Sequence, residues 1–113
     1  MENFEKIYLE GVTLIVVHLI SPTLLEATEF MEIVDEQISF GQTRLVVDLS
    51  ICEHMDSTFL GELIKSFKKM NYIGGALRIV EPATPSQEIF TYTDTLKLFD
   101  LYKTREDAIK SFK

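Results

Sequence analysis

Residues 45–61 decide the fold, and they read LVVDLSICEHMDSTFLG. The run Leu45-Val46-Val47 is continuous, apolar and rich in β-branched side chains, which is typical of a central strand buried on both faces. From Leu60 to Met70 the apolar residues recur at helical spacing, with lysines on the opposite side. The stretch therefore predicts a buried strand, a polar loop and an amphipathic helix in succession.

Asp56, Ser57 and Thr58 lie at the junction between that loop and the helix. A carboxylate at a helix start accepts hydrogen bonds from unpaired backbone N–H groups, so Asp56 is the predicted helix cap. Ser57 and Thr58 then fall in the first turn, at the edge of an open α/β sheet where ligands and partners dock. A capped helix with no further role explains the same residues, because Asp, Ser and Thr are favoured at any helix start.

Strand and helix patterns alternate along the rest of the chain. Residues 4–9 and 12–20 predict an opening hairpin that turns at Glu10-Gly11. A helix is predicted over residues 23–38 from the spacing of Leu24, Ala27, Met31, Val34 and Ile38. Downstream, residues 77–80 predict a strand, residues 84–87 begin a short helix, and residues 98–102 and 104–112 predict a last strand and helix.

This order predicts the α/β class, because strands alternating with helices form parallel neighbours through crossover connections. We expect one domain over residues 1–113, with a mixed, mostly parallel sheet, an N-terminal hairpin and about four packed helices. The side chains expected in the core are those of Leu14, Val16, Leu45, Val47, Leu60, Ile64, Phe67, Leu77 and Ile79.

The chain carries 11 Lys plus Arg and 18 Asp plus Glu, a formal net charge of −7. An acidic surface repels phosphate backbones and anionic lipids, which disfavours nucleic-acid binding and favours a basic protein partner. A need for solubility alone explains the charge equally well. The longest apolar run, residues 12–20, is shorter than the ~20 residues of a membrane span, and the acidic N-terminus is unlike a signal peptide. We therefore expect no membrane insertion and a cytoplasmic location.

Patterns for metal binding or catalysis are weak. His18 lies in an apolar run, which favours a hydrogen-bonded structural role, and His54 with its neighbouring carboxylates matches no defined metal spacing. Cys52 is the single cysteine and has no basic neighbour, so we expect an inert thiol. The sequence thus predicts no catalytic residues, no metal site and no cofactor. An enzyme that uses Asp48, Glu53 and Asp56 around a bound phosphate is a low-ranked alternative, because no base, metal set or phosphate loop accompanies them.

The whole chain resembles the STAS domain, the fold of bacterial anti-sigma factor antagonists. Residues 45–50 are similar to the family's buried central strand with its Asp-Leu-Ser ending, and Met55-Asp56-Ser57-Thr58 is similar to its Asp-Ser-Ser/Thr phosphorylation motif. Residues 74–80, residues 96–102 and Ala108 are similar to its C-terminal half.

The resemblance implies a regulatory binding module that is not an enzyme, acting as an anti-sigma factor antagonist in a partner-switching circuit. It implies Ser57 as the phosphoacceptor, with Thr58 as the second choice. The implied partners are an anti-sigma factor that is also a serine kinase of the GHKL ATPase type, and a PP2C-type phosphatase. The residues expected to bind the partner are Asp56, Ser57, Thr58, Phe59 and Glu62. An alternative within the family is an accessory subunit that binds the ATPase of a membrane transporter.

Two positions depart from the family pattern. Phe59 stands where glycine commonly follows the Asp-Ser-Ser/Thr triplet, and its ring is expected on the docking surface. Residues 18–22 replace the family's Gly-x-Leu-Asp turn, and we expect them to lie near Ser57. Partner choice is therefore expected to differ from that of the usual kinase.

Overall fold

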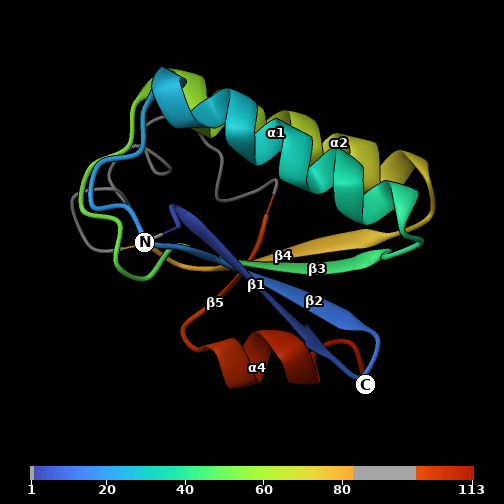
Figure 1. Cartoon of the computed structure of the whole chain (residues 1–113). Helices are drawn as coiled ribbons and strands as arrows, with labels where there is room; N and C mark the ends of the chain where they lie inside the picture. The colour runs from blue at the N-terminus through green and yellow to red at the C-terminus, as the bar shows by residue number, and fades with distance from the viewer. Residues whose placement is uncertain (1, 83–98) are drawn as a thin grey trace.

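The structure is a computed structural model that describes residues 2–82 and 99–113 (Figure 1). In chain order its elements are β1 (Phe4–Leu9), β2 (Val12–Val17), α1 (Leu24–Ser39), β3 (Arg44–Asp48), α2 (Ser57–Tyr72), β4 (Ala76–Val80), β5 (Asp100–Tyr102) and α4 (Arg105–Lys110). Three helices lie in this described part of the chain. The predicted helix that begins at residues 84–87 falls outside the described residues.

The five strands form one sheet in the order β1-β2-β3-β4-β5. β1 and β2 are antiparallel, and every other neighbouring pair is parallel. Helices α1 and α2 cover one face of the sheet, and α4 lies on the other (Figure 1). The predicted α/β fold with a mixed, mostly parallel sheet is confirmed.

The opening hairpin turns where the sequence predicts. Glu10 and Gly11 both have positive φ, 41° and 86°, the conformation of the tight two-residue turn that matches strand twist. β2 ends at Val17 rather than at Ile20, so the predicted strand was too long. The carbonyl of Ile20 instead accepts hydrogen bonds from the backbone N–H groups of Glu53 and His54, because residues 18–22 leave the sheet and join a second loop.

The core between the sheet and the α1–α2 layer is built around three aromatic rings. Phe4 of β1, Phe30 of α1 and Phe59 of α2 are fully buried. The ring centroids of Phe30 and Phe59 are 5.6 Å apart, and those of Phe4 and Phe59 are 6.4 Å apart. Aromatic pairs at these separations stabilise a core beyond the area that they bury.

Helix α1 buries part of the predicted face: Ala27 and Val34 are in the core, and Ile38 is partly buried against it. Its buried residues are Ala27, Phe30, Val34 and Gln37. Leu24 and Met31, both predicted to face inward, are exposed. The sequence pattern allows either stripe because the apolar arc of this helix is wide enough to include both Leu24 and Phe30. Packing of Phe30 against the other two rings decides between them.

Helix α4 covers a second, smaller core on the other face of the sheet. Its Ala108 packs with Val46 and Val80, while Ile109 and Phe112 are partly buried against the same cluster. Thr104 caps the helix, accepting from the Asp107 N–H at 3.1 Å as its sequence position predicts.

Candidate functional site

The candidate site is the edge of the sheet where β3 ends, formed by residues 18–25 and 49–58, and is called the Ser57 edge below. Two loops meet there through backbone hydrogen bonds. Glu53 and His54 donate to Ile20 O at 2.8 and 3.0 Å, and Asp56 donates to Pro22 O at 3.3 Å. Residues 18–22 therefore lie next to the segment that leads into α2, as the sequence predicts.

Asp56 is the N-cap of α2, as predicted, and it also binds α1. Its Oδ1 accepts from the Phe59 N–H at 2.8 Å, which satisfies one of the unpaired donors of the first turn. Its Oδ2 accepts from the Leu24 N–H, the first residue of α1, at 3.0 Å. A single carboxylate thus holds the N-terminal ends of both helices.

Ser57 and Thr58 occupy the first turn of α2 with both side chains exposed. Among the described residues, neither hydroxyl makes a hydrogen bond to another side chain or to the backbone. Helix N-termini carry a partial positive charge, which the capping Asp56 carboxylate offsets in part; the first turn itself contains no acidic residue. Glu62, on the next turn of α2, is half-buried.

Phe59 does not lie on the docking surface, and the expectation that it would is wrong. Its side chain is completely buried and contacts Phe4 and Phe30. The side chain at the third position of the helix points inward, because Asp56 fixes where the helix begins and hence which residues face the sheet. Phe59 is therefore a core residue that supports the Ser57 edge from beneath.

Four exposed apolar side chains at the Ser57 edge were missed by sequence reasoning. Leu25 is 84% exposed, Leu24 61%, Ile20 58% and Ile51 46%. These four residues, the apolar rim, come from the loop after β2, the start of α1 and the loop after β3. Leucine and isoleucine leave water by preference, so four of them exposed on the two loops and the helix start that form this edge are a feature to be explained. The available signal was Leu24-Leu25 at a helix start, where both cannot face the core.

The three carboxylates of the alternative enzyme do not converge. Asp48 and Val46 are two residues apart on β3, so their side chains point to the same face of the sheet, the one that α4 covers. There Asp48 is 2% exposed and pairs with Arg105 of α4, while its Oδ1 accepts from the Ser50 N–H at 2.9 Å. Asp56 lies on the α1–α2 side, and Glu53 is exposed.

Burial and hydrogen bonding act in opposite directions on Asp48. Burial raises the pKa of its carboxyl group. The Arg105 guanidinium and the Ser50 N–H lower that pKa by more than burial raises it, so the pKa lies below its ordinary value. Asp48 is thus a structural ion-pair partner. Burial, with the charge of Asp48, raises the pKa of Cys52 to about 12, which leaves that thiol protonated and unreactive at neutral pH.

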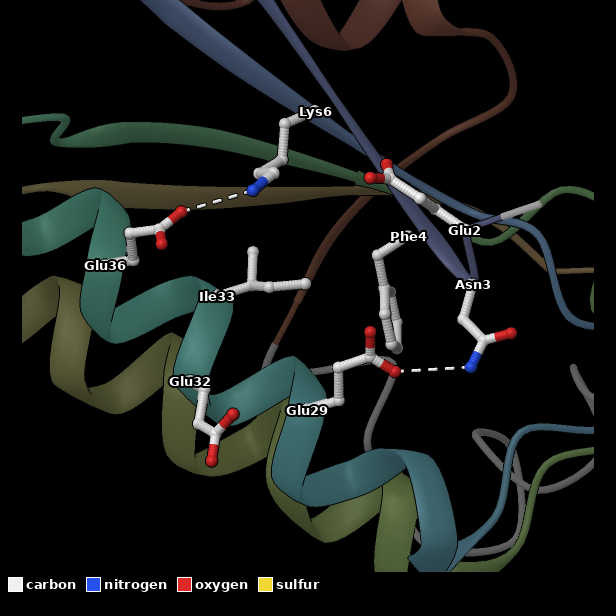
Figure 2. Close-up of a pocket in the computed structure, with 8 residues that line it drawn as sticks. All are labelled: Glu2, Asn3, Phe4, Lys6, Glu29, Glu32, Ile33 and Glu36. Carbon is white, nitrogen blue, oxygen red and sulfur yellow. Dashed lines mark hydrogen bonds and ion pairs between the residues drawn. The ribbon is translucent and has the colours of Figure 1, made fainter.

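A hollow of about 420 Å³ lies between β1 and α1 (Figure 2). Its wall carries four glutamates, of which Glu29 accepts from Asn3 and Glu36 pairs with Lys6, each at 3.2 Å. Figure 2 shows Glu29, Glu32 and Glu36 spread along α1, with Glu2 across the hollow beside the start of β1, so the carboxylates are not directed at one point. In the described part of the chain, no group of three or more His, Cys, Asp or Glu residues could hold a metal ion.

His18, just after β2, has its Nε2 2.8 Å from Glu5 Oε1, in keeping with the predicted structural role. His54 is exposed in the loop before α2. None of the helices in residues 2–82 and 99–113 has the length and apolar character needed to cross a membrane.

A family model described as the STAS domain matches residues 5–108. A Thermotoga neapolitana protein described as a candidate anti-sigma factor antagonist is 25% identical over 76 residues, which cover 67% of each chain. The match to the STAS domain model includes the buried central strand and the Asp56-Ser57-Thr58 segment.

Solved structures share the fold. A candidate anti-sigma factor antagonist from Thermotoga maritima superposes with a TM-score of 0.84 at 21% identity, covering 96% of this chain and 92% of that one. Bacillus SpoIIAA in its phosphorylated form gives a TM-score of 0.75 at 14% identity, covering 97% of this chain and 99% of that one. At these identities the structural likeness establishes the fold.

Proposed function

This chain belongs to the STAS domain family, and on that premise we propose that it is an anti-sigma factor antagonist whose binding is switched by phosphorylation of Ser57. The observation that carries the proposal is the exposed Ser57 hydroxyl on the first turn of α2, bordered by the apolar rim. The similarity to a Thermotoga neapolitana protein described as a candidate antagonist supports it.

In the unmodified state, the apolar rim and the first turn of α2 bind an anti-sigma factor of the GHKL ATPase type, which then releases its sigma factor. The same partner acts as a kinase: the Ser57 oxygen attacks the γ-phosphorus of ATP, ADP leaves, and the hydroxyl proton passes to a base of the kinase. The chain supplies the acceptor alone, because the nearest carboxylate, Asp56, is engaged by two backbone N–H groups. A PP2C-type phosphatase removes the phosphate.

The fold tolerates the phosphate. The group adds about −1.5 to −2 charges and three acceptor oxygens at the positive end of a 16-residue helix. Both bonds of the Asp56 cap use backbone N–H groups and need no Ser57 hydroxyl. SpoIIAA, which shares the fold, has itself been solved in a phosphorylated form.

The interface does not tolerate it. Burying the apolar rim against a partner also removes water from Ser57, and a phosphate there loses its hydration unless the partner supplies paired cations. Asp56 and the exposed Glu53 already make this edge acidic, so the added charge increases repulsion toward an apolar or acidic partner surface. Modification therefore releases the partner without unfolding the antagonist.

The test is capture from a lysate of the source organism with four forms of the chain: wild type, Ser57→Ala, Ser57→Asp and Thr58→Ala. We expect wild type, Ser57→Ala and Thr58→Ala to capture a GHKL-type kinase, and Ser57→Asp to lose it. Titration of the purified kinase should then show Ser57→Asp binding about 10- to 100-fold more weakly, which corresponds to ~1.4–2.8 kcal/mol. Mass spectrometry after incubation with the kinase and ATP should place the phosphate on Ser57.

Thermal melts of all four forms control for folding. Equal affinity of folded Ser57→Asp and wild type would show that negative charge at Ser57 is not the switch. Capture of a transporter ATPase in place of a GHKL-type kinase would assign the chain to the other branch of the family.

A further inference from the structure

A second hollow, of about 270 Å³, lies at the opposite end of the sheet from the Ser57 edge, between the β1–β2 hairpin and the end of α4 (Figure 1). It is called the hairpin hollow below. Its lining residues are Leu9, Glu10, Val12, Arg44, Ile109, Phe112 and Lys113. No residue of the proposed partner-binding surface takes part in it.

The floor and one wall of the hairpin hollow are apolar. Val12 is buried, Ile109 and Phe112 are partly buried against the second core, and Leu9 is exposed at the rim. Apolar surface that is concave and open to solvent is the usual setting for a small ligand. The volume is slightly below the ~300–1,000 Å³ range of drug-sized sites, so a ligand here is small.

Positive charge gathers beside this apolar surface. Arg44 and Arg78 share strand parity with Val46, so both side chains lie on the α4 side of the sheet. Their guanidinium carbons are 5.9 and 4.6 Å from the centroid of the Phe112 ring. Both guanidinium groups thus lie against one ring, at the side of the hairpin hollow that Phe112 lines.

Arg44 is the cation that is available to a ligand. Lys113 is 3.7 Å from Glu10, and Arg78 donates to Ser111 Oγ at 3.0 Å. Arg44 is exposed, lines the hairpin hollow and, within residues 2–82 and 99–113, has no carboxylate within ion-pair distance. The whole chain has a net charge of −7, yet Arg44 places a positive charge beside an apolar hollow. Such a surface favours an anionic ligand.

We infer that the hairpin hollow binds a small single-chain carboxylate, with its hydrocarbon tail against Val12, Ile109 and Phe112 and its head group on Arg44. A guanidinium matches a carboxylate in shape, because its planar N–H groups bond both oxygens at once. The tail takes the place of water on the apolar wall. Charge and apolar contact together select an amphipathic anion over an amphipathic cation or a neutral alcohol of the same length.

The inference is tested by NMR titration of the full ¹⁵N-labelled chain with sodium octanoate as the probe. We expect saturable shifts of the amides of Gly11, Arg44 and Phe112, with a dissociation constant of about 1 mM or below, and no shift at Ser57. Octanol and octyltrimethylammonium, which carry the same tail on other head groups, should bind at least about tenfold more weakly. Acetate, a head group without a tail, should not shift these amides at matched ionic strength.

Arg44→Gln should weaken octanoate binding about tenfold. The matched control Lys65→Gln, which removes the same charge from an exposed position of α2, should leave octanoate binding unchanged. Thermal melts check that both variants fold. Three results overturn the inference: unsaturable shifts, equal binding of octanoate and octyltrimethylammonium by wild type, or equal octanoate binding by Arg44→Gln and wild type. The head-group series uses wild type alone and decides the question even if Arg44→Gln unfolds.

Discussion

At the scale of single residues, Asp56 has a larger structural role than helix capping. Its two carboxylate oxygens accept from two different helices, the Phe59 N–H of α2 and the Leu24 N–H of α1. Without it, one unpaired donor remains at the start of each helix. The relative position of the two helix ends at the Ser57 edge therefore depends on one side chain.

Substitutions of Asp56 distinguish the contributions of its two hydrogen bonds to stability. Asparagine caps a helix about as well as aspartate, so a residue that only capped α2 would tolerate Asp56→Asn almost without cost. Here the asparagine NH₂ would face the Leu24 N–H, donor against donor, and we expect a loss of about 1–2 kcal/mol in the free energy of unfolding. Asp56→Ala should lose about 1–3 kcal/mol, since both bonds go. Urea unfolding measures both; an Asp56→Asn variant as stable as wild type would show that the bond to α1 contributes nothing.

The ion pair of Asp48 gives the protein an acid-dependent component of stability. The pKa of Asp48 in the folded protein lies below its ordinary value of 3.8, so the unfolded chain binds the proton more readily. This stability is present above about pH 4 and is lost as the pH falls below that value. Urea midpoints measured from pH 7 down to about pH 3 should show the loss in wild type and a smaller loss in Asp48→Asn.

Arg105→Gln removes the charge that offsets the burial of Asp48. Arg105 is 44% exposed, so water screens the pair, and we expect a cost of about 1–3 kcal/mol at pH 7 rather than that of a fully buried pair. Its acid-dependent loss should also be smaller than that of wild type. Identical pH profiles for wild type and Arg105→Gln would show that the guanidinium does not set the pKa of Asp48.

The site residues show which features a sequence carries. Asp56 and Ser57 were found because a cap and a first turn are local, fixed by the backbone of a few neighbouring residues. Phe59 was misplaced because its environment comes from Phe4 and Phe30, which are 55 and 29 positions away in the sequence. Nothing near Phe59 in the sequence distinguishes a core ring from a surface ring.

At the scale of elements, two glycines of the α2–β4 unit behave differently. A Cβ at Gly75 would lie 2.5 Å from the backbone oxygen of Thr43 and 2.9 Å from a Met70 methyl carbon. Gly61, inside α2, has nothing within 4 Å of the same position. The first glycine is required by close packing between the turn after α2 and the segment before β3, and the second is not.

Gly75→Ala should therefore destabilise the protein by about 1–3 kcal/mol, the usual range for overpacking against a rigid neighbour. Gly61→Ala, the matched control, should stabilise it by about 0.5–1 kcal/mol, because alanine restricts the unfolded chain and favours a helix. Thermal or urea unfolding gives both values. Equal effects of the two changes would contradict the contact with Thr43.

Helix α1 marks the limit of periodicity as a guide. Its range was predicted to within one residue at each end, since Thr23 and Gly41 signal its start and stop locally. Its buried face was predicted only in part: Ala27 and Val34 are buried as expected and Leu24 and Met31 are exposed, because Leu24 and Phe30 start two overlapping apolar stripes. The buried Gln37, whose amide has no hydrogen-bond partner among the described residues, gives no apolar signal at all.

At the scale of the whole molecule, the two ends of the sheet have different chemistry. The Ser57 edge combines exposed apolar side chains with acidic groups, and the hairpin hollow combines an apolar wall with Arg44. Strand direction, an antiparallel hairpin followed by parallel strands, was predicted from the alternation of patterns along the chain, which needs no side-chain detail. The apolar rim and the hairpin hollow could not be predicted, because each joins residues from three or more elements that meet only after folding.

The rate at which Cys52 is alkylated reports how often the loop around it opens. Its side chain is completely buried although it belongs to the loop that leads from β3 to Ser57, and it is the only cysteine in the chain. An alkylating reagent can reach it only when that part of the protein exposes it, so the rate of labelling counts excursions from the closed state. A phosphate or partner at the Ser57 edge that stabilised the closed loop would lower the labelling rate of Cys52, and one that destabilised the loop would raise it.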